Sequence, residues 1–403
     1  MKKGFILPIV LILMSMLMAV SVVLNKRTVD KTTALTTQQN NFYIKKEMNI
    51  FLEEEVYEVG GESPFTDVVA INDGNGRVSF INSGYIRNTT EGKLWVGQGQ
   101  IDLAGNPGAT CVDISGAIGN NAYCEGIEEF FPCKYKFNLP SERFSQIRGI
   151  DINSGSIPSD FTAIPPGNHE MPNLTQESSP TDLNFTGYGE YHITKFKANR
   201  RTKATFGPGR YSFDRIEFTT GYDPDGNYNL DFAKGSEVWV KDEVKLEVGT
   251  KARFQGDRIY INKLTLNNSG AEVVFGEGIY WIGEIVFGNT GNKITIPEGE
   301  KVKIYTNKIT STNSGTSINP TGKPSQLLIA NYSGDVSFEM DGFNLKGFLY
   351  TDGDVSVTGT NTIQGSVISK NLELKNGATI ELYSEEGVQL PTRRSIENEF
   401  EMW

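Results

Sequence analysis

The sequence predicts a mainly β protein with a long N-terminal α-helix, a β-rich middle region and a C-terminal β-solenoid, or β-helix. Three observations support this fold class. The chain of 403 residues contains 43 Gly, 23 Phe and 16 Tyr, and this composition favours strands and turns. Residues 5–24 are uncharged, and residues 28–58 contain neither Pro nor Gly, as in a continuous helix. The second half repeats short segments in which apolar and polar residues alternate.

The composition argues against several classes of function. The chain has 38 Lys and Arg against 49 Asp and Glu, and the resulting net charge of −11 argues against binding to nucleic-acid phosphates. Two His and three Cys leave little for a His-based triad, and no CxxC or HxxxH spacing supplies a zinc site. We therefore expect a structural protein that has no catalytic residues and requires no cofactor.

The uncharged residues 5–24 are long enough to cross a membrane. As a helix they span about 30 Å, the thickness of a bilayer's hydrocarbon core. Lys2 and Lys3 precede them. A cleavable signal peptide with a site at 19–21 and a plain membrane anchor both fit this pattern.

A third interpretation rests on a resemblance. The start MKKGFILP resembles the leader of type IV prepilins, which is short and basic and ends in Gly before Phe and an apolar helix. The resemblance implies that residues 1–4 are a leader, that prepilin peptidase cuts between Gly4 and Phe5, and that Phe5 is then N-methylated. Ile9 stands where major pilins carry Glu, as in PilX-type minor pilins. The resemblance therefore implies a minor pilin rather than the repeating subunit.

We expect a pilin-like helix over residues 5–60. After the apolar run, Ile44, Met48 and Val56 recur at helical spacing and form an amphipathic stripe, which we interpret as ordinary core packing. Gly60-Gly61 then ends the helix.

Residues 61–152 are predicted to form a β-rich region, because short β-like runs alternate with turn residues. Cys111, Cys124 and Cys133 lie in this region. In an exported protein two of them are candidates for a disulfide, and the sequence does not choose the pair. Residues 153–185 contain five Pro among Ser, Gly, Asn and Thr, and this composition predicts a linker.

Residues 186–390 are predicted to form the solenoid. FGPGRYSFDRIEF at 206–218 recurs 69 positions later as FGEGIYWIGEIVF, and RIYINKLTL at 258–266 recurs as KIYTNKITS at 303–311. Towards the C-terminus the period falls to 17–19 residues. This period predicts coils of three short strands that bury their apolar side chains only against neighbouring coils.

We expect the coils to wind right-handed, with Gly347 and Gly365 in turns and residues 391–403 as a tail. An antiparallel sandwich is the alternative fold. The predicted inward positions are Val336, Phe338, Leu345, Phe348, Val355, Val357, Ile363, Val367, Leu372, Leu374 and Ile380.

A second resemblance covers about half of the chain. The order of short segments, from Gly209–Tyr211 through two GDV triplets to Ile363–Leu374, resembles the repeat domain of MshQ-type MSHA pilus biogenesis proteins. The resemblance implies a place in pilus assembly or adhesion, and it brings no known catalytic residues.

One segment has the composition of a calcium loop. Oxygen-bearing side chains occupy every second position, and calcium is bound by six to eight oxygens. The candidate ligands are Asp223, Asp225, Asn227, Asn229 and Asp231. An Asx-rich turn between strands is the alternative interpretation.

Together these observations predict a structural component of a type IV, MSHA-like pilus or of its assembly machinery, with a role in surface adhesion. The expected partners are prepilin peptidase, other pilin subunits, pilus assembly proteins and the bacterial inner membrane, which the protein leaves for the pilus or cell surface. Two alternatives remain: a secreted β-helix enzyme acting on polysaccharide, and a membrane-anchored scaffold like bactofilins.

Overall fold

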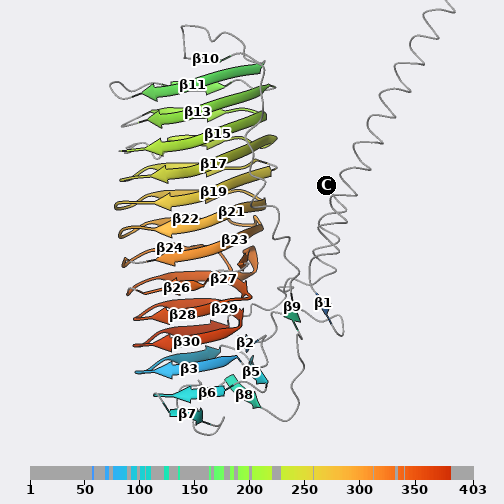
Figure 1. The fold of residues 1–403 in the computed structure, drawn as a ribbon, viewed down its shortest axis with the longest axis vertical. Helices are drawn as coiled ribbons and strands as arrows, with labels where there is room; N and C mark the ends of the chain where they lie inside the picture. The colour runs from blue at the N-terminus through green and yellow to red at the C-terminus, as the bar shows by residue number, and fades with distance from the viewer. Residues whose placement is uncertain are drawn as a thin grey trace, which may run out of the picture. The chain divides into compact units, whose positions relative to one another are not determined.

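The computed structural model describes a stack of parallel β-coils (Figure 1). All the described residues belong to the compact unit Val56–Ile396. They are residues 57–58, 69–71, 76–88, 92–97, 100–104, 106–109, 122–126, 135–136, 163–164, 168–176, 182–185, 189–198, 202–219, 228–256, 258–311, 313–331, 335–339 and 341–382. The predicted leader and tail, and all but the end of the predicted helix, lie outside this range.

Each coil has three faces, which we call A, B and C in chain order. In the first seven coils one long strand bends once and supplies faces A and B. These strands are β11 (Asn168–Gln176), β13 (Glu190–Ala198), β15 (Gly209–Phe218), β17 (Ser236–Leu246), β19 (Arg258–Leu266), β21 (Gly278–Phe287) and β23 (Val302–Ser311).

Face C consists of short strands that follow a turn. They are β10 (Ala163–Ile164), β12 (Asp182–Phe185), β14 (Lys203–Phe206), β16 (Leu230–Phe232), β18 (Lys251–Phe254), β20 (Glu272–Phe275), β22 (Lys293–Thr295), β24 (Ser317–Ile318), β31 (Thr379–Leu382) and β4 (Tyr85–Asn88).

In the later coils the continuous strand moves to the corner between faces C and A, where β27 (Asn344–Thr351) and β29 (Thr362–Ser369) bend at Gly347 and Gly365. A single 3-10 turn, η2 (Pro324–Gln326), precedes β25. The remaining strands of face A are β25 (Leu327–Asn331), β2 (Val69–Ile71), β5 (Gly92–Gly97) and β8 (Ala122–Gly126). Those of face B are β26 (Val336–Phe338), β28 (Asp354–Thr358), β30 (Asn371–Lys375), β3 (Arg77–Ile81) and β6 (Gln100–Leu103).

Two described pairings are antiparallel. β7 (Asn106–Ala109) folds back on β6 at one end of the stack. β1 (Tyr57–Glu58) pairs with β9 (Tyr135–Lys136) in a separate two-stranded sheet. The expectation that the N-terminal helix extends to residue 60 is therefore wrong for Tyr57 and Glu58, because their backbone groups bond to another strand.

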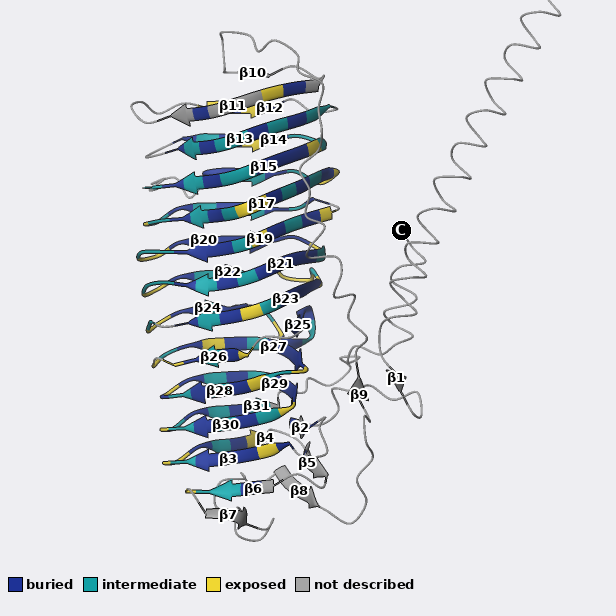
Figure 2. Ribbon diagram, viewed as in Figure 1, coloured by how far each residue is buried: buried dark blue, intermediate teal, exposed yellow. Residues whose placement is uncertain are grey.

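The core is built from inward columns that run along the stack (Figure 2). Each face contributes about two inward side chains per coil, for example Val238 and Val240 on face A and Val244 and Leu246 on face B. On face C, phenylalanine rings from successive coils stack with centroid distances of 4.3 Å for Phe185–Phe206 and 4.4 Å for Phe206–Phe232. The predicted coil of three inward-facing segments is confirmed, although two segments share one strand in the first coils.

All the predicted inward positions are buried, but Phe348 lies outside the core cluster. Leu349 takes its place, in register with Ile329 and Val367. The bend at Gly347 shifts the alternation by one residue, so that prediction was wrong at this position.

The register explains the long repeats. Tyr211 pairs with Val238, Val238 with Ile259, and Ile259 with Tyr280, so the 69-residue repeat spans three coils. Each copy carries a Tyr whose hydroxyl donates to the first Gly of its FGxGxY segment, at 2.8 Å from Tyr211 to Gly207 O and 2.7 Å from Tyr280 to Gly276 O. The motif therefore forms a corner between two faces, which a hydrogen bond from a buried tyrosine stabilises.

Buried asparagines bridge the turns between faces B and C. The Asn292 side chain donates to the carbonyls of Leu266 and Asn289 and accepts the backbone N–H of Ala271. Asn361 makes the same set of bonds to Phe338, Thr358 and Phe343. These bonds satisfy backbone groups that a turn leaves without a ladder partner.

The solenoid also contains strands that the sequence analysis placed elsewhere. β2, β3 and β4 pair in parallel with β29, β30 and β31, so the described strands of the middle region continue the stack beyond its last C-terminal coil. Residues 168–176, which fall in the predicted linker, form β11 at the opposite end. Pro172 is tolerated there because it occupies the bend, where the ladder to β13 is interrupted.

The bend at Gly365 supplies a test of the stack. Its φ is 142°, and a Cβ there would lie 1.9 Å from the Gly347 carbonyl oxygen. We expect Gly365→Ala to destabilise the solenoid by about 3 kcal/mol, from backbone strain and overpacking together.

Gly270→Ala is the matched control. It has a positive φ of 78° but no atom within 4 Å of the new Cβ, so only the conformational cost of about 1 kcal/mol applies. Thermal unfolding followed by circular dichroism compares the two variants, and equal losses of stability would contradict the role given to the bend.

Candidate functional site

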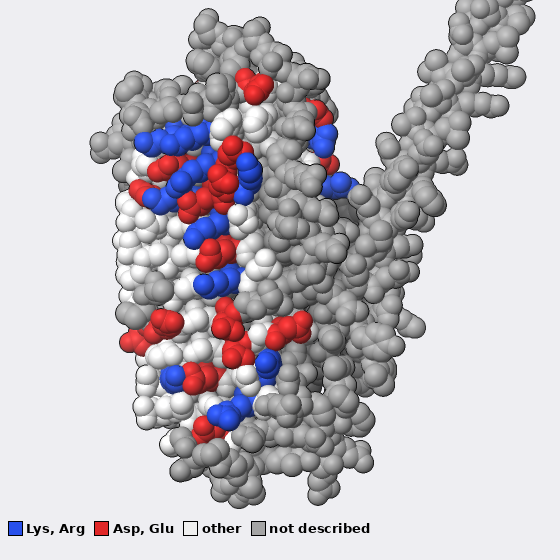
Figure 3. Space-filling view, viewed as in Figure 1, with Lys and Arg blue, Asp and Glu red and all other residues white. Residues whose placement is uncertain are grey.

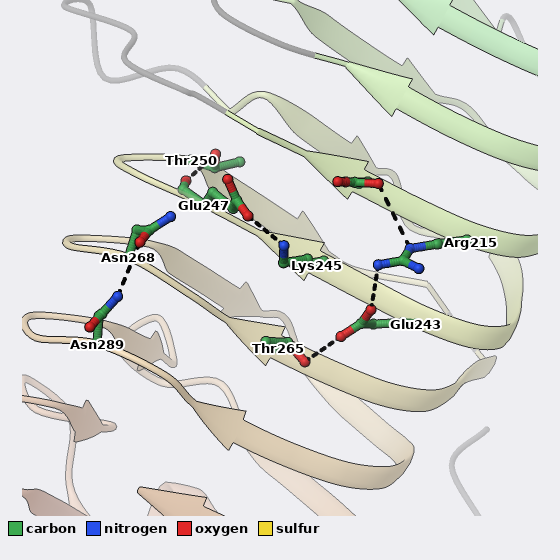
Figure 4. A network of polar contacts seen from close by, with 9 residues as sticks. Arg215, Glu243, Lys245, Glu247, Thr250, Thr265, Asn268 and Asn289 are labelled. Atoms are coloured by element: carbon green, nitrogen blue, oxygen red, sulfur yellow. Dashed lines mark hydrogen bonds and ion pairs between the residues drawn. The ribbon is translucent and has the colours of Figure 1, made fainter. Parts of the chain in front are cut away.

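Face B carries a ladder of charged side chains that pair between coils (Figures 3 and 4). Arg215 is 2.8 Å from Glu243, and Lys263 is 3.0 Å from Glu284, each on the neighbouring strand. Glu243 also accepts a hydrogen bond from Thr265 at 2.7 Å. Exposed pairs of this kind contribute about 0–1 kcal/mol each. They leave no surplus of one sign along the ladder that would attract a charged ligand.

Face C has a similar ladder around Arg253 and Glu272. The Arg253 guanidinium binds both oxygens of Asp231, at 2.7 and 2.6 Å, and lies 4.4 Å from the centre of the Tyr228 ring. The hydrogen bond to Asp231 is the main cause that raises the pKa of Arg253 above its ordinary value. Glu272 lies between Lys251 and Lys293, at 3.5 and 3.4 Å.

A groove lies at the corner between faces C and A in the second to fourth coils. Its volume is about 400 Å³, and Gly189, Pro208, Gly209 and Gly235 form its apolar wall. Arg210 ties the three coils together here, because it pairs with Glu190 on one side and with Glu237 on the other, at 3.3 Å. Its guanidinium also lies 5.4 Å from the Trp239 ring.

The charged side chains at this groove are already paired with one another. Arg210 is half exposed and already engaged by two carboxylates. The groove therefore presents a guanidinium neutralised by two carboxylates beside glycine backbone and Pro208.

A second unusual group is Glu300, at the same corner between β22 and β23. Its Oε2 is buried and has no hydrogen-bond partner among the described atoms. Burial raises the pKa of the Glu300 carboxyl above its ordinary value, and the nearby negative charge of Glu277 adds to this shift. The backbone N–H of Glu277 and the charges of Arg253 and Lys234 oppose it.

The structure places two of the five candidate calcium ligands. Asn229 is buried, and its side chain accepts the Lys251 N–H at 3.0 Å and donates to the Thr202 carbonyl. Asp231 is held by Arg253. Both groups are used by the fold, so a calcium ion would compete with these contacts. Asp223, Asp225 and Asn227 lie outside the described residues, and calcium binding stays a prediction.

The other predicted sites fall largely outside the described part of the chain. Gly4, Phe5, Cys111 and Cys133 are not among the described residues. Cys124 lies in β8, opposite Leu94 of β5. Within the described ranges no group of three or more His, Cys, Asp or Glu is placed to hold a metal ion. The same ranges contain no helix long and apolar enough to span a membrane.

Sequence reasoning did not single out Arg210, its two partner carboxylates, or Glu300. These charged residues form no sequence motif, and only the pairing register of successive strands brings them together. Glu190, Arg210 and Glu237 are spaced by 20 and 27 residues, which are the lengths of two successive coils. Aligning the chain coil by coil would have brought them together.

The environment of Glu300 predicts a pH-dependent stability. The pKa of Glu300 in the folded protein is raised above the unfolded value of about 4.5. Its contribution to the free energy of unfolding is therefore greatest below that pH and is lost as the pH rises through the folded pKa. We expect Glu300→Gln to remove this loss, so that the variant's melting temperature falls less than the wild type's between pH 4.5 and 8.

Glu298→Gln, on the exposed side of the same turn, controls for the removal of one negative charge. The measurement is the melting temperature of the wild type and both variants at a series of pH values between 4.5 and 8. Parallel curves for wild type and Glu300→Gln would contradict a raised pKa at Glu300.

Comparison with known proteins matches part of this solenoid. Residues 195–385 match the model of a protein family described as a domain of unknown function (DUF7305). No curated protein and no solved structure matches the chain. The matched residues run from within β13 to just beyond β31 and include nine successive strand segments of face B. Residues 195–385 thus resemble the DUF7305 domain, and in this structure they form a β-solenoid of about nine turns.

Proposed function

We propose that this protein is a structural, non-catalytic component of a type IV, MSHA-like pilus or of its assembly machinery, with a role in surface adhesion. The observation that carries the proposal is the leader-like start, in which Lys2, Lys3 and Gly4 precede Phe5 and an uncharged run to residue 24. A prepilin leader of this kind delivers a protein to the inner membrane and then to the pilus.

The length and rigidity of the solenoid support this proposal. The nine turns formed by residues 195–385 alone, at about 4.8 Å per strand step, make a body roughly 43 Å long along its axis. Its strands are joined by parallel backbone ladders and by ion pairs between coils, such as Arg215–Glu243. Such a body suits a rigid module that projects from a fibre, and in this proposal its coils wind right-handed.

The corner groove around Arg210 supports a role in contact with other molecules. It combines a half-exposed guanidinium with two carboxylates on adjacent coils, and the guanidinium lies over the Trp239 ring. In this proposal the partners are prepilin peptidase, other pilin subunits, pilus assembly proteins and the inner membrane.

Mass spectrometry of the N-terminal peptide, from protein purified out of its native host, tests the proposal. A mature chain that begins at N-methylated Phe5 is the expected result. Cleavage near Ser21 would instead favour a secreted β-protein, including an enzyme acting on polysaccharide. An intact Met1 would favour a fixed anchor or a membrane-bound scaffold.

Gly4→Val tests the same step genetically. Because prepilin peptidase requires the small residue before the cut, we expect the variant to keep residues 1–4 and to disappear from the sheared surface fraction. Lys3→Arg keeps the leader's charge and serves as the control. Normal processing of Gly4→Val would contradict the proposal.

A further inference from the structure

The outward side of face A carries a column of apolar side chains. Register places Trp239, Tyr260, Trp281 and Tyr305 one above the other on successive coils, with ring centroids 5.7, 6.4 and 4.3 Å apart. The same column continues through Ala330, Tyr350 and Ile368.

From Trp281 to Ile368 this column is buried although it points away from the core. Trp281 is 3 % exposed, Tyr305 1 %, and Tyr350 and Ile368 are fully buried. Leu328 and Phe348, in the neighbouring outward column, are buried as well. By contrast, the outward Lys308 of face B has a side chain that is 55 % exposed. The outward side of face A is therefore shielded from water from Trp281 to Ile368, whereas the ladder of face B stays open to water.

Five of these outward aromatics make further contacts. Tyr260, Trp281, Tyr305, Phe348 and Tyr350 each have a hydrogen bond, ion pair or ring contact in addition to those within the ladder. All-parallel sheets usually have both surfaces covered, and among the described residues only face A has a buried outward column. The question is which segment supplies the cover.

The topology requires one segment to travel the whole length of the stack. β8 ends at Gly126 on the last rung of face A, and β10 begins at Ala163 at the other end. Twelve strand-to-strand steps separate β8 from β11 on face A. At about 4.8 Å a step the distance is about 58 Å. Residues 127–162, which we call the return segment, reach about 120 Å when extended. They include β9, which pairs with β1.

The composition of the return segment matches the exposure along face A. Its first half contains Phe130, Phe131, Phe137 and Phe144, whereas residues 153–162 contain three Ser and a single Phe, Phe161. The outward column is fully buried near the β8 end, at Tyr350 and Ile368, and becomes partly exposed at Tyr260 and Trp239.

We propose that the return segment docks along the outward side of face A, with its aromatic half against the column from Trp281 to Ile368. The apolar surfaces of the two match, and burial of aromatic side chains is the dominant attraction. The docked segment links the two ends of the stack through a second route besides the coils.

Site-specific photo-crosslinking in the purified full-length chain tests this proposal. p-Benzoylphenylalanine replaces Tyr260 or Tyr305 on face A, and Thr310 on face B of the same strand as Tyr305 is the control. We expect cross-linked peptides from both face A positions to map within residues 127–162, and those from Thr310 to map elsewhere. Cross-links from face A to residues 28–58, to residues 383–403 or to a second, isotope-labelled copy would overturn the proposal.

Limited proteolysis gives an independent readout. Trypsin can cut the return segment after Lys134, Lys136, Arg143 and Arg148. Trp281→Ser weakens the docking surface, and Val286→Ser, outward on face B of the same strand, is the matched control. We expect cleavage in the return segment to be several-fold faster in Trp281→Ser only, with the circular dichroism of the solenoid retained. Equal rates in the two variants would contradict the docking.

Discussion

Parallel hydrogen bonding between successive coils is the constraint on which the rest of this structure depends. It fixes the register, so that a residue in one coil stands directly over its counterpart in the next, as Phe206 does over Phe185. Identical or similar side chains then form columns, both inside and outside. The corners must keep this spacing without a ladder of their own, and Tyr280, Asn292 and Asn361 supply the missing bonds there.

The same register organises the surface. A charge on one coil meets the charge of its neighbour at the spacing of one strand, so opposite signs in successive coils are favoured and like signs are disfavoured. Lys263, Glu284 and Lys308 alternate in this way. On face A the column is apolar instead, and it is buried. The two faces therefore differ, because the outward side chains of face A are buried from Trp281 to Ile368 and Lys308 on face B is exposed.

Much of the solenoid could be predicted because its signals are local. Alternation of apolar and polar residues within each strand gives the inward positions from Val336 to Ile380. The 17–19-residue period and the 69-residue repeat are visible when nearby segments of the sequence are compared. The bend at Gly347 misled the assignment of Phe348, since a glycine corner changes which residue points inward. The placement of β2, β3 and β4 could not be predicted, because their partners lie about 290 residues away and share no repeat with them. The groove around Arg210 was missed for a related reason, since its three charges come from three coils and form no contiguous motif.

The pairing of β3 with β30 has a consequence for the order in which the protein matures. Arg77 donates its backbone N–H to Asn371, and Asn376 donates to the Ile81 carbonyl. β2, β3 and β4 are synthesised early, but their partners β29, β30 and β31 are synthesised near the end of the described chain. Until then β2 to β6 present unpaired backbone edges, which are prone to aggregate. Synthesis of β30 must therefore finish before β3 can pair with it and close this part of the stack.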